Sequence, residues 1–274
     1  MGPHRVGGLT PAQQRLVSLL IRGIPTNSLT TVANELAVEN PGDLVAKLGP
    51  ALLSDEPAVA LDRDYVEHHF AELCRVQASY SVEGSRVIAA RRNASVFIDD
   101  CDTAALLATA LKASGVATIL TKSTSDAQLA NVDVAITIDQ SAISPVNHRR
   151  FLSLGVPQIA IQFDSTGVFI SPLIEVGKTP CLTCLQIAGG EAQIAIDTQL
   201  LFSAQRFDDS VSEHFAVAIA AQTALRRIDQ QAGFEIADFH RVGYRLNSST
   251  GAIAEFRWHF AENCLCHQGL DGRV

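Results

Sequence analysis

Apolar residues before residue 58 recur at intervals of three and four, which predicts short amphipathic helices. Three stretches show this pattern, "PAQQRLVSLL", "SLTTVANELA" and "PGDLVAKLGPALLS". The first begins with the signal of a capping box, because Thr10 is followed by Pro11 and by Gln13. The run "PAVALD" then predicts a strand. Three helices and a strand in this order give the outline of a winged-helix module, and a helical cap on the main domain is the alternative.

From residue 94 the pattern changes to short β-branched runs that alternate with helical stretches, which is typical of a parallel sheet covered on both faces. The runs "SVFI", "VATIL", "VDVAITI" and "VPQIAIQF" predict strands. The stretches "TAALLATALKASG" and "SPVNHRRFLSLG" predict helices that end at glycine. A strand pair in "TGVFISPLIEVGKTPCLTC", a long helix in "SVSEHFAVAIAAQTALRRIDQQAG" and a hairpin that turns at "NSSTG" complete the pattern.

The residues between these two parts read as a connector with a polar helix and a strand-like "SRVIAA". We therefore expect a winged-helix-like module over residues 1–57, a connector over residues 58–93, and an α/β domain with a Rossmann-like sheet over residues 94–274.

Composition and charge narrow the functional classes. The chain has 274 residues, of which 47% are hydrophobic, and this is ample for a packed core. Its formal net charge of −8, without clustered Lys and Arg, argues against a nucleic-acid binder. No apolar run approaches the roughly 20 residues of a membrane span, and the N-terminus lacks a secretory apolar region. The sequence therefore predicts a cytoplasmic protein without a membrane partner.

The turn after the first predicted strand is unusual for a nucleotide-binding fold. It reads Asp99, Asp100, Cys101 and Asp102, with no glycine. Glycine lets backbone N–H groups approach a phosphate, whereas these side chains crowd it and their carboxylates repel it. Asp102 is expected to cap the following helix. We therefore expect no useful ATP binding here, and a magnesium ion that bridges the acids to phosphate is the alternative.

Four of the six cysteines form two short pairs. Cys181 and Cys184 make a CxxC, and Cys264 and Cys266 make a CxC near the end of the chain. Two thiolate pairs that a fold brings together are a common tetrahedral zinc site. The alternatives are that His267 replaces one sulfur, that the CxxC is a redox motif, or that the thiols are buried and unreactive.

At this point residues 94–266 resemble the ThiF/MoeB group of the ubiquitin-activating-enzyme superfamily. The resemblance rests on the order of "VDVAITIDQ", "VNHRRFLSLGVPQIAIQF", "GVFISPLIEVGKTPCLTC" and "WHFAENCLC". It implies a structural Zn²⁺ on the four cysteines and a homodimer through the sheet domain. The chain looks most like the ThiF-like proteins of actinobacteria that are associated with ribosomal peptide modification, which include leader-peptide-binding partners of YcaO-type cyclodehydratases.

The chain departs from that family where nucleotide would bind. The turn glycines are missing, and Thr121 and Lys122 stand where the family has a ribose-binding acid. The stretch between the second and third predicted strands is also too short for the family's segment with the phosphate-contacting Arg and Lys. Asp139 matches the Asp of the family's Thr-Asp-Asn motif, with Asn147 and Arg149 on the next helix. The alternative role of Asp139 is to cap the helix that begins at Ser144.

The resemblance to the family, together with the missing nucleotide-binding residues, leads to two functional hypotheses. The first is a non-catalytic, degenerate ThiF-like protein that binds a leader peptide or a modifying enzyme. The second is an adenylyltransferase that activates a peptide or protein C-terminus with ATP and Mg²⁺. For the first, Leu44, Leu48 and Leu52 recur at helical spacing and are candidates for a peptide groove in the N-terminal module. The alternative is that these leucines fill the module's own core.

Overall fold

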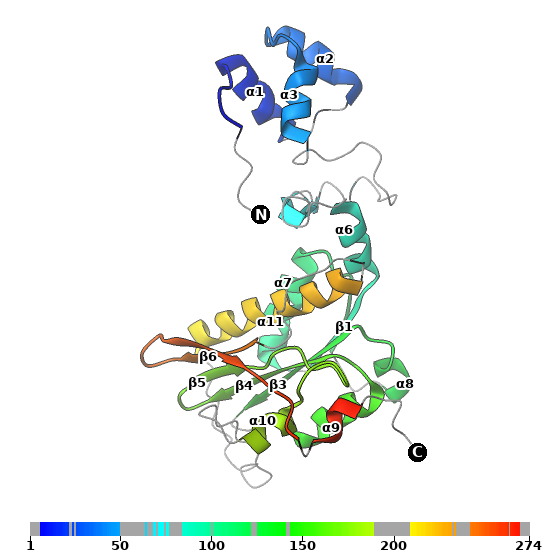
Figure 1. Cartoon of the computed structure of the whole chain (residues 1–274), viewed down its shortest axis with the longest axis vertical. Helices are drawn as coiled ribbons and strands as arrows, with labels where there is room; N and C mark the ends of the chain where they lie inside the picture. Colours follow the sequence, from blue (N-terminus) through cyan, green and yellow to red (C-terminus); the bar gives the residue numbers. More distant parts are fainter. Residues whose placement is uncertain are drawn as a thin grey trace. The chain divides into compact units, whose positions relative to one another are not determined.

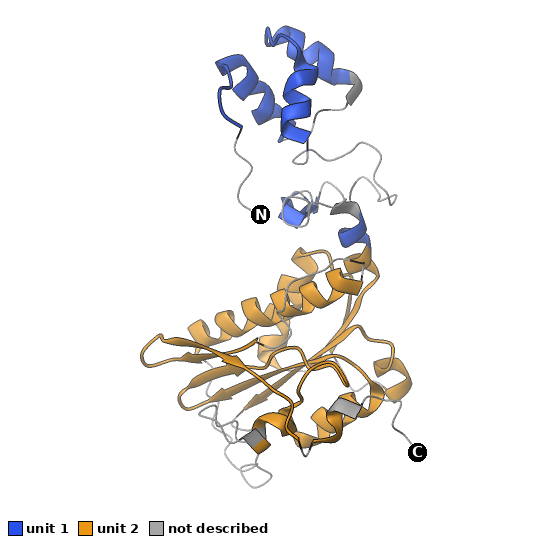
Figure 2. Cartoon of the chain, viewed as in Figure 1, with its two compact units in different colours: residues 1–89 blue, residues 90–274 orange. Residues whose placement is uncertain are grey.

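The computed structural model forms two compact units, residues 1–89 and residues 90–274 (Figure 2). It describes residues 6–21, 24, 26–49, 64, 68–69, 71–73, 75–76, 84–99, 101–121, 125–140, 143–188, 209–231, 233, 242–262 and 264–268. Among these residues, no helix combines the length and the apolar character that a membrane span requires.

The first unit contains three short helices, as the apolar spacing predicted (Figure 1). They are α1 (Pro11–Leu20), α2 (Thr26–Glu35) and α3 (Pro41–Leu48). The capping box is present, because the Gln13 N–H donates to Thr10 Oγ1 at 3.2 Å and the Thr10 N–H donates to Gln13 Oε1 at 2.9 Å. The sequence signals therefore identify where α1 begins.

Leu44 and Leu48 lie in the small core between these helices. Their side chains are 1% and 8% exposed, and they pack with Leu16 and Ala33. In this conformation they fill the core, which is the alternative that the sequence left open. Leu52 and the predicted strand "PAVALD" lie outside the described residues. The winged-helix assignment is therefore not confirmed.

The second unit is built on a mixed sheet whose described strands follow the order β2-β1-β3-β4-β5-β6-β7. The first four strands in this order are parallel, and β5, β6 and β7 are antiparallel to their neighbours. Their bounds are β1 (Ser95–Ile98), β2 (Thr118–Leu120), β3 (Val134–Gln140), β4 (Gln158–Asp164), β5 (Gly167–Ile170), β6 (Val242–Asn247) and β7 (Ile253–Arg257). The predicted α/β, Rossmann-like class is confirmed.

Helices cover both faces of this sheet (Figure 1). Val134 and Ile136 of β3 face α7 and α11, whereas Ala135 between them packs with Phe151 of α9 on the opposite face. This alternation explains why the central strands are apolar throughout. The helices of this region are α6 (Gly84–Asn93), α7 (Asp102–Ala113), α8 (Asp126–Leu129), α9 (Pro145–Leu154), α10 (Leu182–Ala188), α11 (Ser210–Gln231) and the short 3₁₀ helix η2 (Leu265–Gln268).

Two local predictions were wrong. The stretch "SRVIAA" is not a strand but part of α6. Its Val87, Ile88 and Arg91 are all buried, at the three- and four-residue spacing of a helix face, and its alanines and arginines favour a helix. The strand pair expected from residue 166 onward is one strand, β5, followed by a single bridge between Gln158 and Ile174.

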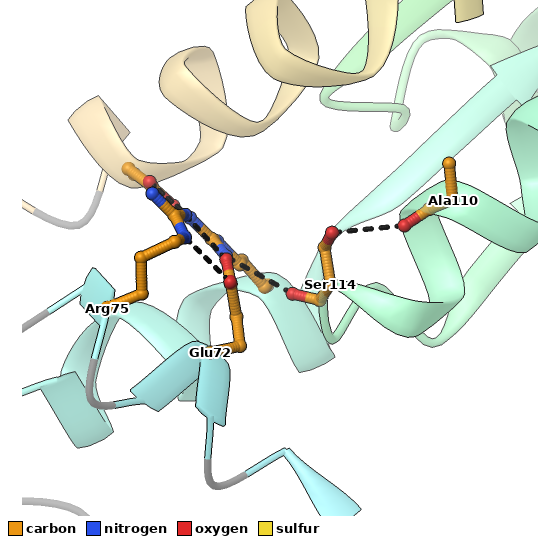
Figure 3. Close-up of polar contacts among 6 residues, drawn as sticks. Glu72, Arg75, Ala110 and Ser114 are labelled. Carbon is orange, nitrogen blue, oxygen red and sulfur yellow. Dashed lines mark hydrogen bonds and ion pairs between the residues drawn. The ribbon is translucent and has the colours of Figure 1, made fainter. Parts of the chain in front are cut away.

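A buried ion pair, which the sequence analysis did not predict, fastens α6 to α11. Arg91 Nε donates to Asp229 Oδ1 at 2.7 Å, and Nη2 donates to Oδ2 at 2.6 Å. Both side chains are 1% exposed. Arg91 Nη1 also donates to the carbonyl of Ser114, whose hydroxyl donates to the carbonyl of Ala110 at 3.0 Å (Figure 3). These three bonds from Arg91 join α6, α11 and the end of α7.

A second ion pair, in the first unit, has a different character. Arg75 Nη2 lies 2.6 Å from Glu72 Oε1, but the Arg75 side chain is 52% exposed (Figure 3). Exposed pairs of this kind contribute about 0–1 kcal/mol. Of these two pairs, we therefore expect the Arg91–Asp229 pair to contribute more to stability.

Candidate functional site

The two cysteine pairs come together in the structure as their spacing predicted. Cys181 precedes α10 and Cys184 lies in its first turn, whereas Cys264 precedes η2 and Cys266 lies in it. The Cys181 and Cys264 sulfurs are 3.5 Å apart, and those of Cys184 and Cys266 are 3.3 Å apart. All four sulfurs lie within 4.8 Å of one another. These separations exceed the S–S bond length of about 2.05 Å, so the cysteines are thiols here.

The backbone before the CxxC is held in place by contacts from distant segments. Arg227 of α11 donates to Glu175 Oε1 at 2.9 Å, and the Glu175 N–H donates to Thr179 Oγ1 at 2.6 Å. The Gly177 N–H donates to the carbonyl of Cys266 at 2.9 Å, so the two cysteine segments also meet through their backbones. The fold therefore preorganises the four sulfurs.

Apolar packing surrounds the four cysteines on the sheet face that α9 and α10 cover. Trp258 stacks on Phe169 of β5 with ring centroids 5.8 Å apart, and both rings are buried. Ala160 of β4 and Ile174 belong to the same cluster as Cys181. These cysteines and the apolar residues packed on them, together called the cysteine lobe, are therefore continuous with the core of the sheet. A change at the sulfurs should alter the packing on this face of the sheet.

The donor set fits a soft, tetrahedral metal ion. Zinc–sulfur bonds of about 2.3 Å place the ligands of a tetrahedral site roughly 3.8 Å apart, close to the separations seen here. Burial raises the pKa of Cys181 to about 11 and also raises the pKa of Cys266. A bound cation would offset this cost of burying thiolates. The four cysteines could therefore hold a metal ion.

Two carboxylates meet at the other candidate site, the carboxyl ends of β1 and β3. The strand order reverses between these two strands, and open α/β sheets bind ligands at such a switch point. Asp99 follows β1, and its Oδ2 accepts the Ile138 N–H at 3.3 Å. Asp139 lies near the end of β3. Asp100 lies outside the described residues. The edge that would face a nucleotide phosphate therefore carries Asp99 and Asp139.

Asp139 is unfavourably placed for a negative charge. Burial, opposed by a backbone hydrogen bond from Ser144 and aided by the charge of Asp99, raises the pKa of Asp139 to about 7. Burial also raises the pKa of Asp99. Asp139 Oδ2 is buried and has no hydrogen-bond partner among the described residues. An added phosphate would increase the repulsion at this edge.

The start of α7 corrects one sequence prediction. Cys101, not Asp102, is the N-cap residue, and its side chain makes no capping hydrogen bond. Asp102 is the first helical residue and is exposed. An acid there still suits the positive end of the helix dipole.

The remaining residues of the predicted adenylating set lie on α9. Ser144 caps this helix by accepting the Asn147 N–H at 3.4 Å, so Asp139 is not the capping residue but binds the backbone of the cap. Asn147 is half-buried and Arg149 is exposed. Thr121 follows β2, and Lys122 lies outside the described residues.

A buried polar chain near these residues had no sequence signal beyond the two glutamines in "VPQIAIQF". His148 Nδ1 lies 2.8 Å from Gln158 Oε1, and Gln158 Nε2 donates to Thr137 Oγ1 at 3.2 Å. Burial lowers the pKa of His148, which therefore stays neutral at neutral pH. His148 Nε2 has no partner among the described residues. This chain joins α9 to β4 and β3.

Comparison with known proteins identifies the fold. The sequence matches no protein-family model and no curated protein. E. coli MccB has a similar structure, with a TM-score of 0.57, 13% identity, and alignment over 92% of this chain and 82% of MccB. The microcin C7 biosynthetic enzyme MccB, in complex with N-formylated MccA, has a TM-score of 0.58 at 14% identity. The alignment covers 93% of this chain and 89% of that enzyme. The predicted ThiF-type fold is therefore confirmed.

A further similar structure is a heterocyclase solved in complex with substrate and cofactor. Its TM-score is 0.56 at 15% identity, and the alignment covers 94% of this chain but 34% of the heterocyclase. A chain of this fold can therefore form one part of a larger protein.

Proposed function

We propose that this chain is a non-catalytic ThiF-like protein that binds a leader peptide or a modifying enzyme in ribosomal peptide modification. The observation that carries the proposal is the pair of carboxylates, Asp99 and Asp139, at the switch point of the sheet. Carboxylates at this edge repel phosphate, while the ThiF-type fold is retained. A retained fold with an altered nucleotide edge favours binding over catalysis.

Coulomb's law gives the size of the repulsion between these carboxylates and a phosphate. At a pH above about 7, where Asp139 is ionised, two unit charges 4 Å apart repel by about 1 kcal/mol in water and about 4 kcal/mol near a protein surface. A helix N-terminus and glycine N–H groups normally attract phosphate at such a turn. Here the N-terminus of α7 follows Asp99 and Cys101, and neither residue offers the close backbone approach of glycine.

The similar structures support a peptide as the partner. MccB has been solved with the peptide MccA, and the heterocyclase has been solved with its substrate. The proposal extends these contexts to this chain, with the N-terminal module as the peptide-binding part and the four cysteines as a structural zinc site. Leu44 and Leu48 then shape the module from its core, because they are buried there.

The alternative function is an adenylyltransferase in which Asp139 orients a metal-bound nucleotide. Its support is the position of Asp139 at the carboxyl end of a central strand, with Asn147 and Arg149 on the next helix. In this case the cation would have to neutralise both Asp139 and Asp99. The alternative makes a different prediction for nucleotide binding.

We expect no saturable ATP binding. Isothermal titration of the full chain with ATP and excess Mg²⁺ should give no saturable heat up to millimolar nucleotide, because the acidic edge repels the phosphates. Binding in the micromolar range that Asp139→Ala abolishes would contradict the proposal and favour the adenylyltransferase instead. Asp126→Ala is the matched control, since Asp126 is an exposed acid of the same unit, with a side chain that is 66% exposed.

We also expect residues 1–57 to be necessary for peptide binding. A chain that begins at residue 58 should lose binding to a fluorescein-labelled leader peptide encoded beside this gene, as measured by fluorescence anisotropy. The truncation keeps α6 and its Arg91, so the ion pair to Asp229 remains.

The same truncated chain provides the control. It should unfold cooperatively and keep its metal, because the four cysteines and the sheet lie in the second unit. Undiminished peptide binding would place the site outside residues 1–57. Loss of cooperative unfolding would instead support the helical-cap role of the module.

A further inference from the structure

Trp258 is the only tryptophan of the chain, and it lies in the cysteine lobe immediately after β7. Its side chain is 3% exposed, yet its indole N–H has no hydrogen-bond partner among the described residues. A buried tryptophan usually finds a partner for this group, because an unpaired buried donor lowers stability. The indole N–H therefore points to an acceptor that the lobe gains in another state, such as the metal-bound one.

Aromatic packing holds the indole ring against the lobe. Trp258 stacks on Phe169 of β5 with an angle of 11° between the ring planes. Phe256, two residues earlier, packs on the same cluster, so alternate residues at the end of β7 face this side of the sheet. A phenylalanine at position 258 would supply the same apolar contact, so packing alone does not account for the indole N–H.

The segment that follows Trp258 folds onto the sulfurs. The Cys264 N–H donates to the carbonyl of Ala261 at 3.0 Å, and the Ala261 N–H donates to the sulfur of Cys184. Ala261 lies between Trp258 and Cys264 in the sequence. The indole ring is therefore joined to the cluster both by its own packing and by a short backbone segment that bonds the sulfurs.

Backbone N–H groups donate to three of the four sulfurs. They run from Ala261 to Cys184, from Cys184 to Cys181, and from Cys181 to Cys266. Donors of this kind around metal ligands orient the ligands and adjust the affinity for the metal. The sulfur of Cys264 is the one that a side-chain donor would complete.

We propose that Trp258 is a positioning residue of the metal site, and that its indole N–H donates to the sulfur of Cys264 once this sulfur is a metal-bound thiolate. A thiol is a weak acceptor, whereas a thiolate accepts a strong, charge-assisted hydrogen bond. Ligation also moves the sulfurs, because those of Cys181 and Cys264 are 3.5 Å apart here and the ligands of a tetrahedral zinc site are roughly 3.8 Å apart. Both effects explain why the N–H is unpaired in the thiol state.

This role rests on the zinc site that the proposed function includes, and it adds a residue to that site. The competing acceptor is the side chain of Gln162, which lies opposite Phe169 in the register of β4 and β5. A bond to Gln162 would stabilise the protein equally with and without metal, whereas a bond to a thiolate acts only when the metal is present. Metal affinity and the spectrum of the metal-bound protein therefore separate the two acceptors.

The test uses Trp258→Phe in the full chain, which removes the N–H and keeps an aromatic ring on Phe169. With Co²⁺ in place of zinc, the sulfur-to-metal charge-transfer band should move to longer wavelength, because a hydrogen bond lowers the energy of the sulfur electrons. The dissociation constant for Zn²⁺, measured by competition with a chelating dye, should rise by roughly tenfold or more. Phe256→Leu is the matched control, since it alters packing on the same cluster without removing a donor, and it should leave the band in place.

A second measurement uses the wild-type chain and does not depend on how the variant folds. With spin-active cadmium in the site, the single indole N–H resonance should show a coupling to the metal across the hydrogen bond to sulfur. Metal-bound wild type without this coupling, or a Trp258→Phe variant with an unchanged band and affinity, would overturn the role and leave the zinc site intact. A wild type that binds no metal would overturn the zinc site and this role together.

Discussion

Replacing Cys181 and Cys184 together with serine is expected to remove the metal and to unfold the cysteine lobe. Protein purified without a His tag should contain about one zinc per chain by elemental analysis, and the double variant should contain almost none. Structural zinc contributes an apparent binding free energy of about 10–16 kcal/mol in small zinc modules. The loss should therefore lower the thermal unfolding midpoint strongly.

The packing around the sulfurs explains why the effect should spread. Cys181 and Cys184 belong to one buried cluster with Ala160 of β4 and Phe169 of β5. Without the ion, thiols that are 3.3–4.0 Å apart have no common ligand to hold them there. We expect this face of the sheet to lose its ordered cover, with increased binding of a hydrophobic dye.

Cys101→Ser is the matched control for the cysteine variant. Cys101 is a free, partly exposed cysteine at the start of α7, far in the sequence from both pairs. It should leave the metal content unchanged. A wild-type protein that is folded and free of metal would contradict the zinc assignment.

Breaking the Arg91–Asp229 pair on one side is expected to cost about 3–5 kcal/mol of the free energy of unfolding, because the remaining charge stays buried and loses the opposite charge that it bonds at two atoms. Arg91→Met and Asp229→Leu should show this cost in urea unfolding followed by far-ultraviolet circular dichroism. Both side chains are 1% exposed, so water cannot replace the missing partner without local opening.

The double variant Arg91→Met with Asp229→Leu distinguishes charge from packing. It removes both charges, and such replacements are often neutral or stabilising, so most of the loss should be recovered. Arg150→Met is the control, because Arg150 pairs with Asp126 across an exposed surface, and we expect a loss of about 0–1 kcal/mol. Equal losses in the single and double variants would show that packing alone decides the effect.

Much of the sheet was predictable because its strands are buried on both faces. Such strands are short, continuous β-branched runs, and "SVFI" and "VPQIAIQF" appear as β1 and β4. The stretch "SRVIAA" failed because two β-branched residues cannot by themselves distinguish a strand from a helix. The helix α6 buries Arg91 on the same face as Val87 and Ile88, and the partner of Arg91, Asp229, lies 138 residues away.

The candidate sites were predictable to different degrees. The four cysteines could be grouped from their spacing, because each pair supplies two ligands from one turn. Asp139 was indicated by a family resemblance, whereas its closeness to Asp99 follows from the strand order. His148 and Gln158 form a contact that depends on how α9 lies on β4, and a one-dimensional pattern contains no signal for that.

The cysteine cluster also determines how much an insertion into the chain changes its stability. It joins residues separated by 83 positions, so a bound metal closes a long loop that includes α11, β6 and β7. In a chain-entropy description, a loop of this size restricts the unfolded chain by about 4–5 kcal/mol. That quantity depends on the logarithm of loop length, so doubling the loop changes it by only about 0.6 kcal/mol. The exposed turn between β6 and β7 can therefore accept an inserted tag with little effect on the stabilisation that the metal crosslink provides.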